Sequence, residues 1–290
     1  MPNASNFPLF VATVSYAITK RIAVTLAVPF QFATRSQAIR NPHLPDNQFG
    51  NDPVIDRYET SAYGLSDMRL LATGWLLEPE ENKKQNVSVG LGVLFPTGKK
   101  DVKDTFTVFA TNAAGAYQPR AVIRNVDNSI QPGAGVWGII FDVAGFIEPV
   151  EDLNVFASGT YIATPQEDAG VNDGGNNGGR IWSTGDSYLF RAGVGYTFHP
   201  GIFCDGLTLS LGGRMEGTPS TDMFGGSAGR RRPGFAISIE PGLLYSWNRW
   251  FASFSAPVAV YRNREEDFAG NEGDAAFADF ITLFTVGRSF

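Results

Sequence analysis

Cysteine and histidine are scarce in this chain of 290 residues. Cys204 is the only cysteine, which excludes an intrachain disulfide and a thiolate metal cluster. Of the two histidines, His43 lies in a predicted loop and His199 at a predicted turn. Neither is accompanied by a nucleophile motif such as G-x-S-x-G or by a phosphate-binding loop. The sequence therefore predicts no enzyme, no metal site and no cofactor.

Long apolar runs and an excess of positive charge are also missing. No stretch of about 18 apolar residues is present, so no transmembrane helix can be identified. The net charge of -6 and a pI near 5.0 argue against a nucleic-acid partner. No export signal is visible, because no basic residue precedes the apolar residues 7–18. We expect that such a signal is removed or absent from this sequence.

Glycine and aromatic residues, by contrast, are abundant. The chain has 33 Gly, 23 Phe, 9 Tyr and 5 Trp, which suits twisted strands, tight turns and aromatic girdles. Apolar and polar residues alternate with a period of two about eleven times, most clearly over residues 207–216. The alternation predicts strands near 9–18, 21–34, 60–77, 85–96, 133–147, 153–164, 184–198, 206–217, 233–247, 250–263 and 276–290.

The predicted strands are long, and their connections alternate between short and long. Strands of about 10–14 residues exceed the usual five or six and suit a tilted crossing of a bilayer. Short periplasmic turns and long extracellular loops are typical of outer-membrane barrels. The alternation alone leaves open which face is inside, but a soluble sandwich has no reason to keep the asymmetry. The long connections are residues 35–58, 97–132, 165–183, 218–232 and 264–275.

The last strand ends the chain on an aromatic residue. Phe290, Val286 and Phe284 share one face of this strand with Arg288. Such a row resembles the closing strand and assembly signal of a bacterial outer-membrane β-barrel. An ordinary half-buried strand that ends in Phe is the alternative. We assign Phe290, Val286 and Phe284 as the candidate assembly signal.

These observations predict an all-β fold, an antiparallel transmembrane (outer-membrane) β-barrel that forms a single domain over residues 1–290. About eleven strands are predicted in this chain, and bacterial single-chain barrels have an even number. We therefore expect twelve strands in the complete barrel, with the first strand and the signal absent here. The alternative is a strand that the pattern does not reveal, within residues 101–131.

Four segments resemble motifs of a known family. Residues 16–24 read YAITKRIAV, residues 64–70 GLSDMRL, residues 90–98 GLGVLFPTG and residues 131–137 QPGAGVW. Together they resemble the outer-membrane transporter family named for the MetA phenol-degradation pathway. Ser66, where the family usually has glycine, and Arg288 depart from its pattern. The resemblance implies a barrel in the bacterial outer membrane for uptake of small, aromatic or hydrophobic molecules.

Charged residues on the polar faces are candidates for the lumen. Opposite charges would pair there, because isolated charges in a narrow lumen lose much of their hydration. Two interpretations are open, namely a constriction that selects solutes and salt bridges that prop the wall. Asp67 and Arg69 rank first, since they lie two apart and Asp67 falls in a motif. The candidates are Arg21, Asp67, Arg69, Asp142, Arg191, Arg214, Glu216 and Glu240.

The long loops carry charged patches of both signs. Acidic residues, Asp186 among them, could bind hard cations, but their spacing matches no EF-hand and solvated loops are expected. Residues 230–232 are three arginines that could either meet lipid phosphates or lie in a solvated loop. The expected partners are outer-membrane lipid and lipopolysaccharide, the barrel-assembly machinery and a small-molecule solute. A closed barrel whose loops bind partners without transport is the alternative, and the oligomeric state stays open.

Overall fold

The structure, a computed structural model, describes residues 5–40, 54–113, 115, 117–171, 182–199, 206–268, 270, 275 and 277–290. Strands dominate these residues, and the one helix among them is a 3-10 turn, η1 (Asn128–Ile130). No helix in these ranges is long and apolar enough to cross a membrane.

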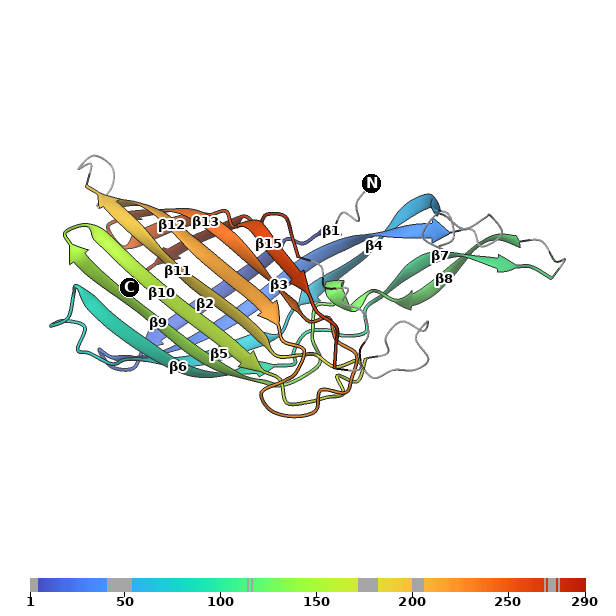
Figure 1. The fold of residues 1–290 in the computed structure, drawn as a ribbon, viewed down its shortest axis with the longest axis horizontal. Helices are drawn as coiled ribbons and strands as arrows, with labels where there is room; N and C mark the ends of the chain where they lie inside the picture. The colour runs from blue at the N-terminus through green and yellow to red at the C-terminus, as the bar shows by residue number, and fades with distance from the viewer. Residues whose placement is uncertain are drawn as a thin grey trace.

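Fourteen strands form one antiparallel sheet in which each crossing pairs with the next along the chain (Figure 1). Three crossings are interrupted: β1 (Ser5–Asn6) with β2 (Leu9–Ala17), β4 (Val54–Leu65) with β5 (Met68–Trp75), and β14 (Trp250–Ser255) with β15 (Val258–Arg264). With each such pair counted once, the fourteen strands make eleven crossings. The others are β3 (Ile22–Arg40), β6 (Gln85–Phe95), β9 (Gly138–Val150), β10 (Leu153–Ala163), β11 (Ser187–Phe198), β12 (Gly206–Thr218), β13 (Gly234–Trp247) and β16 (Leu283–Arg288).

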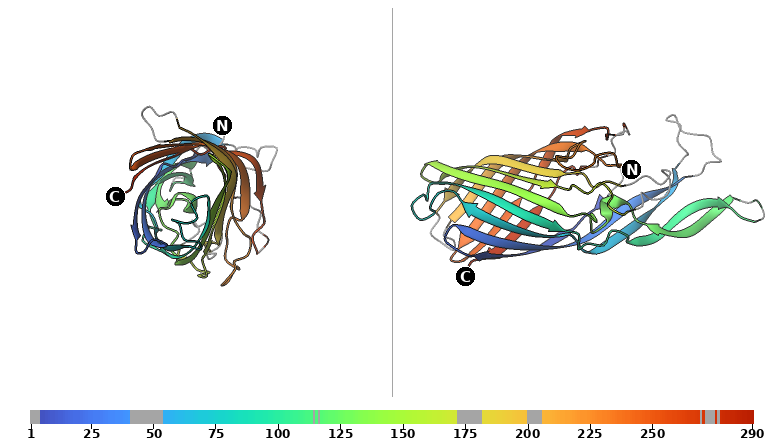
Figure 2. Two further views of the ribbon diagram at one scale, coloured as in Figure 1. Left: turned by 90° about the vertical axis from the view of Figure 1, so that its left-hand side faces the viewer. Right: turned by 90° about the horizontal axis from the view of Figure 1, so that it is seen from below.

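The predicted all-β antiparallel fold is confirmed, and each predicted strand overlaps one of the crossings. The sheet curls into a half-barrel, which Figure 2 shows from one end. Among the described strands, no ladder joins β2 to β16, so both strands have an outer edge without a partner there. The twelfth strand stays a prediction.

The connections segregate by length, as predicted. Residues 18–21, 151–152 and 248–249 make short turns at the end of the sheet where β16 also stops. The long connections gather at the opposite end, where they lie across the mouth of the half-barrel (Figure 1). We refer to these two ends as the turn end and the loop end.

The connection between β6 and β9 contains a hairpin that the sequence pattern did not reveal. Strands β7 (Lys103–Thr111) and β8 (Tyr117–Asn125) form a separate two-stranded sheet. This hairpin projects beyond the loop end beside β3 and β4 (Figures 1 and 2). The rings of Tyr58 and Phe106 make an edge contact at 6.2 Å, and Asp104 accepts the N–H of Ser61 at 2.8 Å. The strands within residues 101–131 therefore add nothing to the barrel count.

The strands bury their polar residues and expose their apolar ones. In β6, Leu91 is 59% exposed and Val89 47%, whereas Asn86 is 3% and Ser88 9% exposed. A water-soluble sheet would show the reverse, because burial of apolar surface drives its folding. The buried apolar residues of the described chain form only clusters of three or four residues. The sheet thus has an apolar outer face and a polar inner face.

Candidate functional site at the mouth of the barrel

Asp67 ties three distant segments together at the loop end. It lies in the break between β4 and β5 and is 8% exposed. Its Oδ1 accepts the N–H of Gly98 at 2.9 Å, and its Oδ2 accepts the N–H of Ala134 at 2.7 Å. The Thr97 hydroxyl donates to the Ser66 carbonyl at 3.0 Å. Three of the four sequence motifs therefore meet around one carboxylate, which bonds residues 31 and 67 positions further along the chain.

Glycine is required where two of these segments cross. A Cβ atom at Gly133 would lie 2.3 Å from the carbonyl oxygen of Gly98, and one at Gly98 would lie 2.6 Å from the Cα of Gly133. Such distances are too short for any side chain. The N–H of Gly133 also donates to the Lys99 carbonyl at 2.8 Å. The two backbones therefore pack directly against each other.

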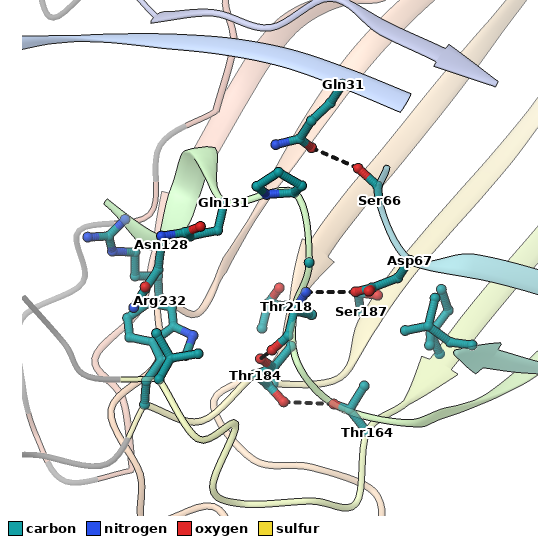
Figure 3. Close-up of a pocket in the computed structure, with 18 of the residues that line it drawn as sticks. Gln31, Ser66, Asp67, Asn128, Gln131, Thr164, Thr184, Ser187, Thr218 and Arg232 are labelled. Atoms are coloured by element: carbon teal, nitrogen blue, oxygen red, sulfur yellow. Dashed lines mark hydrogen bonds between the residues drawn. The ribbon is translucent and has the colours of Figure 1, made fainter. Parts of the chain in front are cut away.

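Glutamine side chains satisfy the buried backbone groups behind this crossing. Ser66 donates its hydroxyl to the Gln31 Oε1 at 3.1 Å, and the Gln31 amide donates to the Ile130 carbonyl at 2.9 Å (Figure 3). Gln131 bonds both the N–H and the carbonyl of Val102, at 3.0 and 3.1 Å. Ser66, which departs from the family pattern, thus has a hydrogen-bonding role of its own.

Asp186 and Arg231 hold the other long loops. Asp186 is fully buried and accepts the Tyr161 hydroxyl at 2.6 Å and the N–H groups of Thr164 and Met223 at 2.7 Å each. Arg231 is 3% exposed. The expectation of a solvated loop is therefore wrong for Asp186, and the burial of Arg231 fits neither of its two alternatives, lipid phosphates or solvent. Arg231 forms a buried ion pair with Asp222, in which the nitrogen–oxygen distance is 2.6 Å.

Asp127 joins two arginines that come from distant parts of the chain. The nitrogen–oxygen distances are 2.5 Å to Arg35 and 2.9 Å to Arg232. Burial alone would raise the pKa of the Asp127 carboxyl. The hydrogen bond and charge of Arg232, with the charge of Arg35 and the N–H of Ser129, hold its pKa well below the usual range. Arg232 also lies over the Trp182 ring, 5.4 Å from the centroid.

These segments line an open cavity of about 420 Å³ at the loop end (Figure 3). This volume falls in the range of about 300–1,000 Å³ that small-molecule sites occupy. Asp67 and Arg69 both line it, together with apolar residues such as Leu94, Ile162 and Trp182. The two candidates ranked first by sequence therefore share one cavity.

Four other predicted lumen residues form pairs on the inner wall. Arg191 on β11 reaches across β12 to Glu240 on β13, at 2.6 Å, and Ser255 donates to the same carboxylate at 2.8 Å. Gly212 on β12 pairs with Glu240 on β13 and with Gly193 on β11, so no side chain of these two glycines lies beside the Glu240 carboxylate. The others are Arg214 and Glu216, which pair within β12 at 2.5 Å.

The two remaining lumen candidates lie apart from these pairs. Asp142 accepts the Thr160 hydroxyl at 2.7 Å on the neighbouring strand. Arg21 lies in a turn at the turn end and donates to the backbone carbonyls of Trp75 and Leu76 at 2.9 and 2.5 Å. Arg21 also lines a small cavity with Thr73 and Ser88, so its place on the lumen wall stays a prediction. Selection of solutes by any of these residues stays a prediction.

The candidate assembly residues are exposed on the last strand. Phe284 is 72%, Val286 54% and Phe290 98% exposed. Arg288 lies 5.2 Å from the ring centroids of both Trp250 and Phe290. Their role in assembly stays a prediction.

The two histidines and the possible metal ligands are the remaining residues that could carry chemistry. His199, at the turn end, pairs with Asp152 at 2.8 Å, and His43 lies outside the described residues. Within the described ranges, no group of three or more His, Cys, Asp or Glu is placed to hold a metal ion.

Comparison with known proteins gives structural similarity but no match by sequence. No protein-family model and no curated protein matches the sequence. Among solved structures, the chain is similar to the crystal structure of a Pseudomonas aeruginosa FadL homologue, with a TM-score of 0.40 and 10% sequence identity. The match covers 98% of this chain and 66% of that one, so the chain spans about two thirds of that protein's length. At this TM-score no function is transferred, and the fold assignment rests on the chain's own strand order.

Proposed function

We propose that the protein is a bacterial outer-membrane channel that passes small aromatic or hydrophobic molecules by passive diffusion, without an enzymatic step. The observation that carries this proposal is the inverted burial of the strands, with apolar residues outside and polar residues inside. A lipid bilayer is the solvent in which such a sheet is stable, because its outer face then contacts hydrocarbon. The resemblance of the four sequence motifs to the MetA-pathway transporter family also supports the proposal.

The outer face supports a lipid environment along successive strands. Val194 on β11, Leu211 on β12 and Ile239 on β13 are 47%, 56% and 50% exposed. Trp247 and Trp250 flank a turn at the turn end and are 54% and 45% exposed, as residues of an interfacial aromatic girdle would be. We assign lipid and lipopolysaccharide as the surroundings of this face. The exposed last strand would meet the barrel-assembly machinery.

The inner face supports a path for solutes. Its charges on β11 to β13 are paired with each other. Its glycines let neighbouring strands pack closely, because a Cβ atom at each would lie within 3.1 Å of an atom of a neighbouring strand. The β7/β8 hairpin projects beyond the loop end, away from the strands of the wall (Figure 2). The mouth cavity lies where a solute would enter from the loop end. The wall glycines that pack in this way are Gly90, Gly92, Gly193, Gly195 and Gly212.

Single-channel conductance of the refolded full-length chain in planar bilayers tests this function. We expect discrete conductance steps at constant voltage. Heat-modifiable migration on gels would establish beforehand that the protein is folded. A folded protein that produces no steps would contradict the channel.

A second function is favoured by one observation. The ends of β3 and β4 and the β7/β8 hairpin form an arm that extends well beyond the mouth (Figure 1). Such an arm offers extended strands to a partner outside the barrel. A folded but silent barrel would favour a protein whose loops bind partners without transport.

A further inference from the structure

We propose that the mouth cavity binds small monocarboxylates with an apolar body and that Arg69 selects them. This inference rests on the proposed function, since it gives the channel's entry a substrate class. Two observations support it: the charged side chains around the cavity other than Arg69 already have partners, and apolar side chains lie beside Arg69.

Arg69 is the lining cation whose guanidinium is left to a ligand. In the described part of the chain it makes no hydrogen bond and no salt bridge, although it lines the cavity and is solvent-exposed there. The neighbouring cations are engaged: Arg231 with Asp222, Arg232 with Asp127, and Lys100 with the Ala169 carbonyl at 2.7 Å. A guanidinium presents two parallel N–H groups, which match the two oxygens of a carboxylate.

The carboxylates around the cavity are engaged in bonds of their own. Each oxygen of Asp67 accepts a backbone N–H, and among the described residues no salt bridge joins Asp67 to Arg69. Asp186 accepts a hydroxyl and two backbone N–H groups, and Asp222 and Asp127 hold arginines. A cationic ligand would therefore compete with existing bonds, whereas an anionic ligand would meet an available donor.

An apolar wall lies directly beside this donor. Leu94 is the cross-strand partner of Arg69 on β6 and lines the cavity with Ile162. Both pack with Ile140, and Leu71 covers the cluster. A ligand whose carboxylate bonds Arg69 would therefore place its body against Leu94 and Ile162. Burial of a ring or short alkyl chain there is favourable, so the cavity fits an amphipathic monoanion better than an inorganic anion.

Titration calorimetry of the full-length protein in detergent tests this site with benzoate and its neutral isostere benzamide. We expect benzoate to bind more tightly than benzamide. Arg69→Gln should weaken benzoate about tenfold or more, since a charge-assisted hydrogen bond contributes that much, and should leave benzamide unchanged. Arg69→Lys keeps the charge but loses the two parallel N–H groups of the guanidinium. Its affinity for benzoate should lie between those of the unchanged protein and Arg69→Gln. Arg249→Gln, the same change at the turn end, is the matched control and should alter neither affinity.

Three results would overturn the site: no binding of benzoate, equal binding of both compounds, or equal weakening of both by Arg69→Gln. Conductance measured on the same preparations separates this inference from the channel. An open channel that neither binds nor is blocked by benzoate would keep the proposed function and reject the site. A silent barrel with Arg69-dependent binding would reject the channel and keep the site.

Discussion

The inner wall of β9 to β13 and the mouth at the loop end are built in opposite ways. The wall is a continuous antiparallel ladder in which β12 pairs with β13 over thirteen residues in register. Its charged pairs join residues on the same strand or two strands apart. The mouth has almost no regular structure, and single side chains join segments as far apart as Asp127 and Arg232, 105 residues along the chain.

This difference separates two sources of stability. The wall depends on repeated backbone hydrogen bonds and, in the proposed function, on lipid around its outer face, so we expect most of its inner side chains to change at little cost. The mouth depends on a few buried polar side chains, each of which satisfies several backbone groups. We therefore expect the two regions to respond to different substitutions.

The largest effect is expected at the buried ion pair of the mouth. Asp222→Asn leaves Arg231 charged and without its partner, which costs about 3–5 kcal/mol for a buried pair. Hydrogen exchange of residues 218–233 should accelerate, while the ladder of β12 and β13 stays protected. Adding Arg231→Met should restore part of the protection. Unchanged exchange at the mouth, or equal loss in the ladder, would remove the distinction between the regions.

The wall should respond to charge on its outer face. Leu91→Arg places a cation in the middle of the apolar row of β6 and should destabilise the barrel in lipid vesicles by about 2–4 kcal/mol. Ile123→Arg is the matched control, because Ile123 is 75% exposed on the projecting hairpin. The folded fraction on gels after urea titration measures both. Equal destabilisation by both variants would argue against a lipid-facing wall.

The crossings, the breaks in the strands and the β7/β8 hairpin could be predicted from the sequence to very different degrees. The period-two alternation located all eleven crossings, because every residue of a barrel strand faces one of two solvents. Breaks in the strands, such as residues 66–67 and Pro257, were not predicted, because an interruption of one or two residues barely disturbs the alternation. The β7/β8 hairpin was only an alternative in the prediction, since apolar and polar residues alternate weakly in its two strands.

The mouth could be predicted only in part. Asp67 was found through a motif, and Arg69 through its place two residues later on the strand. The partners of the arginines at 231 and 232 were missed, because Asp222 and Asp127 carry no local signal that they meet these residues in space. Asp127 did have one readable feature: it caps the η1 turn through Ser129. Long-range pairing of loop residues is not encoded in periodicity.

A smaller effect is expected from breaking the ion pair of the inner wall. Glu240→Gln removes the partner of Arg191, whose side chain is 38% exposed and can be hydrated by lumen water. We expect a loss of about 1–2 kcal/mol in the free energy of unfolding, below that at Asp222. Urea titration in vesicles measures it. A loss as large as at Asp222 would mean that the wall, too, depends on buried polar pairs.

The smallest effect is expected from pH at the mouth. Because the folded pKa of Asp127 is depressed, its contribution is fully present above the usual Asp pKa of about 3.9 and declines as pH falls below it. Protease cleavage at the loop end should therefore stay constant from neutral pH to about 4 and rise below that. The protease should cleave the Asp127→Asn variant faster than the unchanged protein at neutral pH. A rise in cleavage of the unchanged protein between pH 7 and 5 would contradict the Arg35–Asp127–Arg232 contact.

The central claim is that the sheet is inverted, with its apolar row in lipid and its polar row in water. Spin labels placed one at a time along residues 86–93, in a Cys204→Ser background, test this claim most directly. Collision rates with oxygen, which concentrates in lipid, and with a water-soluble nickel complex should alternate with a period of two and in opposite phase. Labels at Val87, Val89, Leu91 and Val93 should meet oxygen. An alternation of reversed phase, or none, would contradict the account.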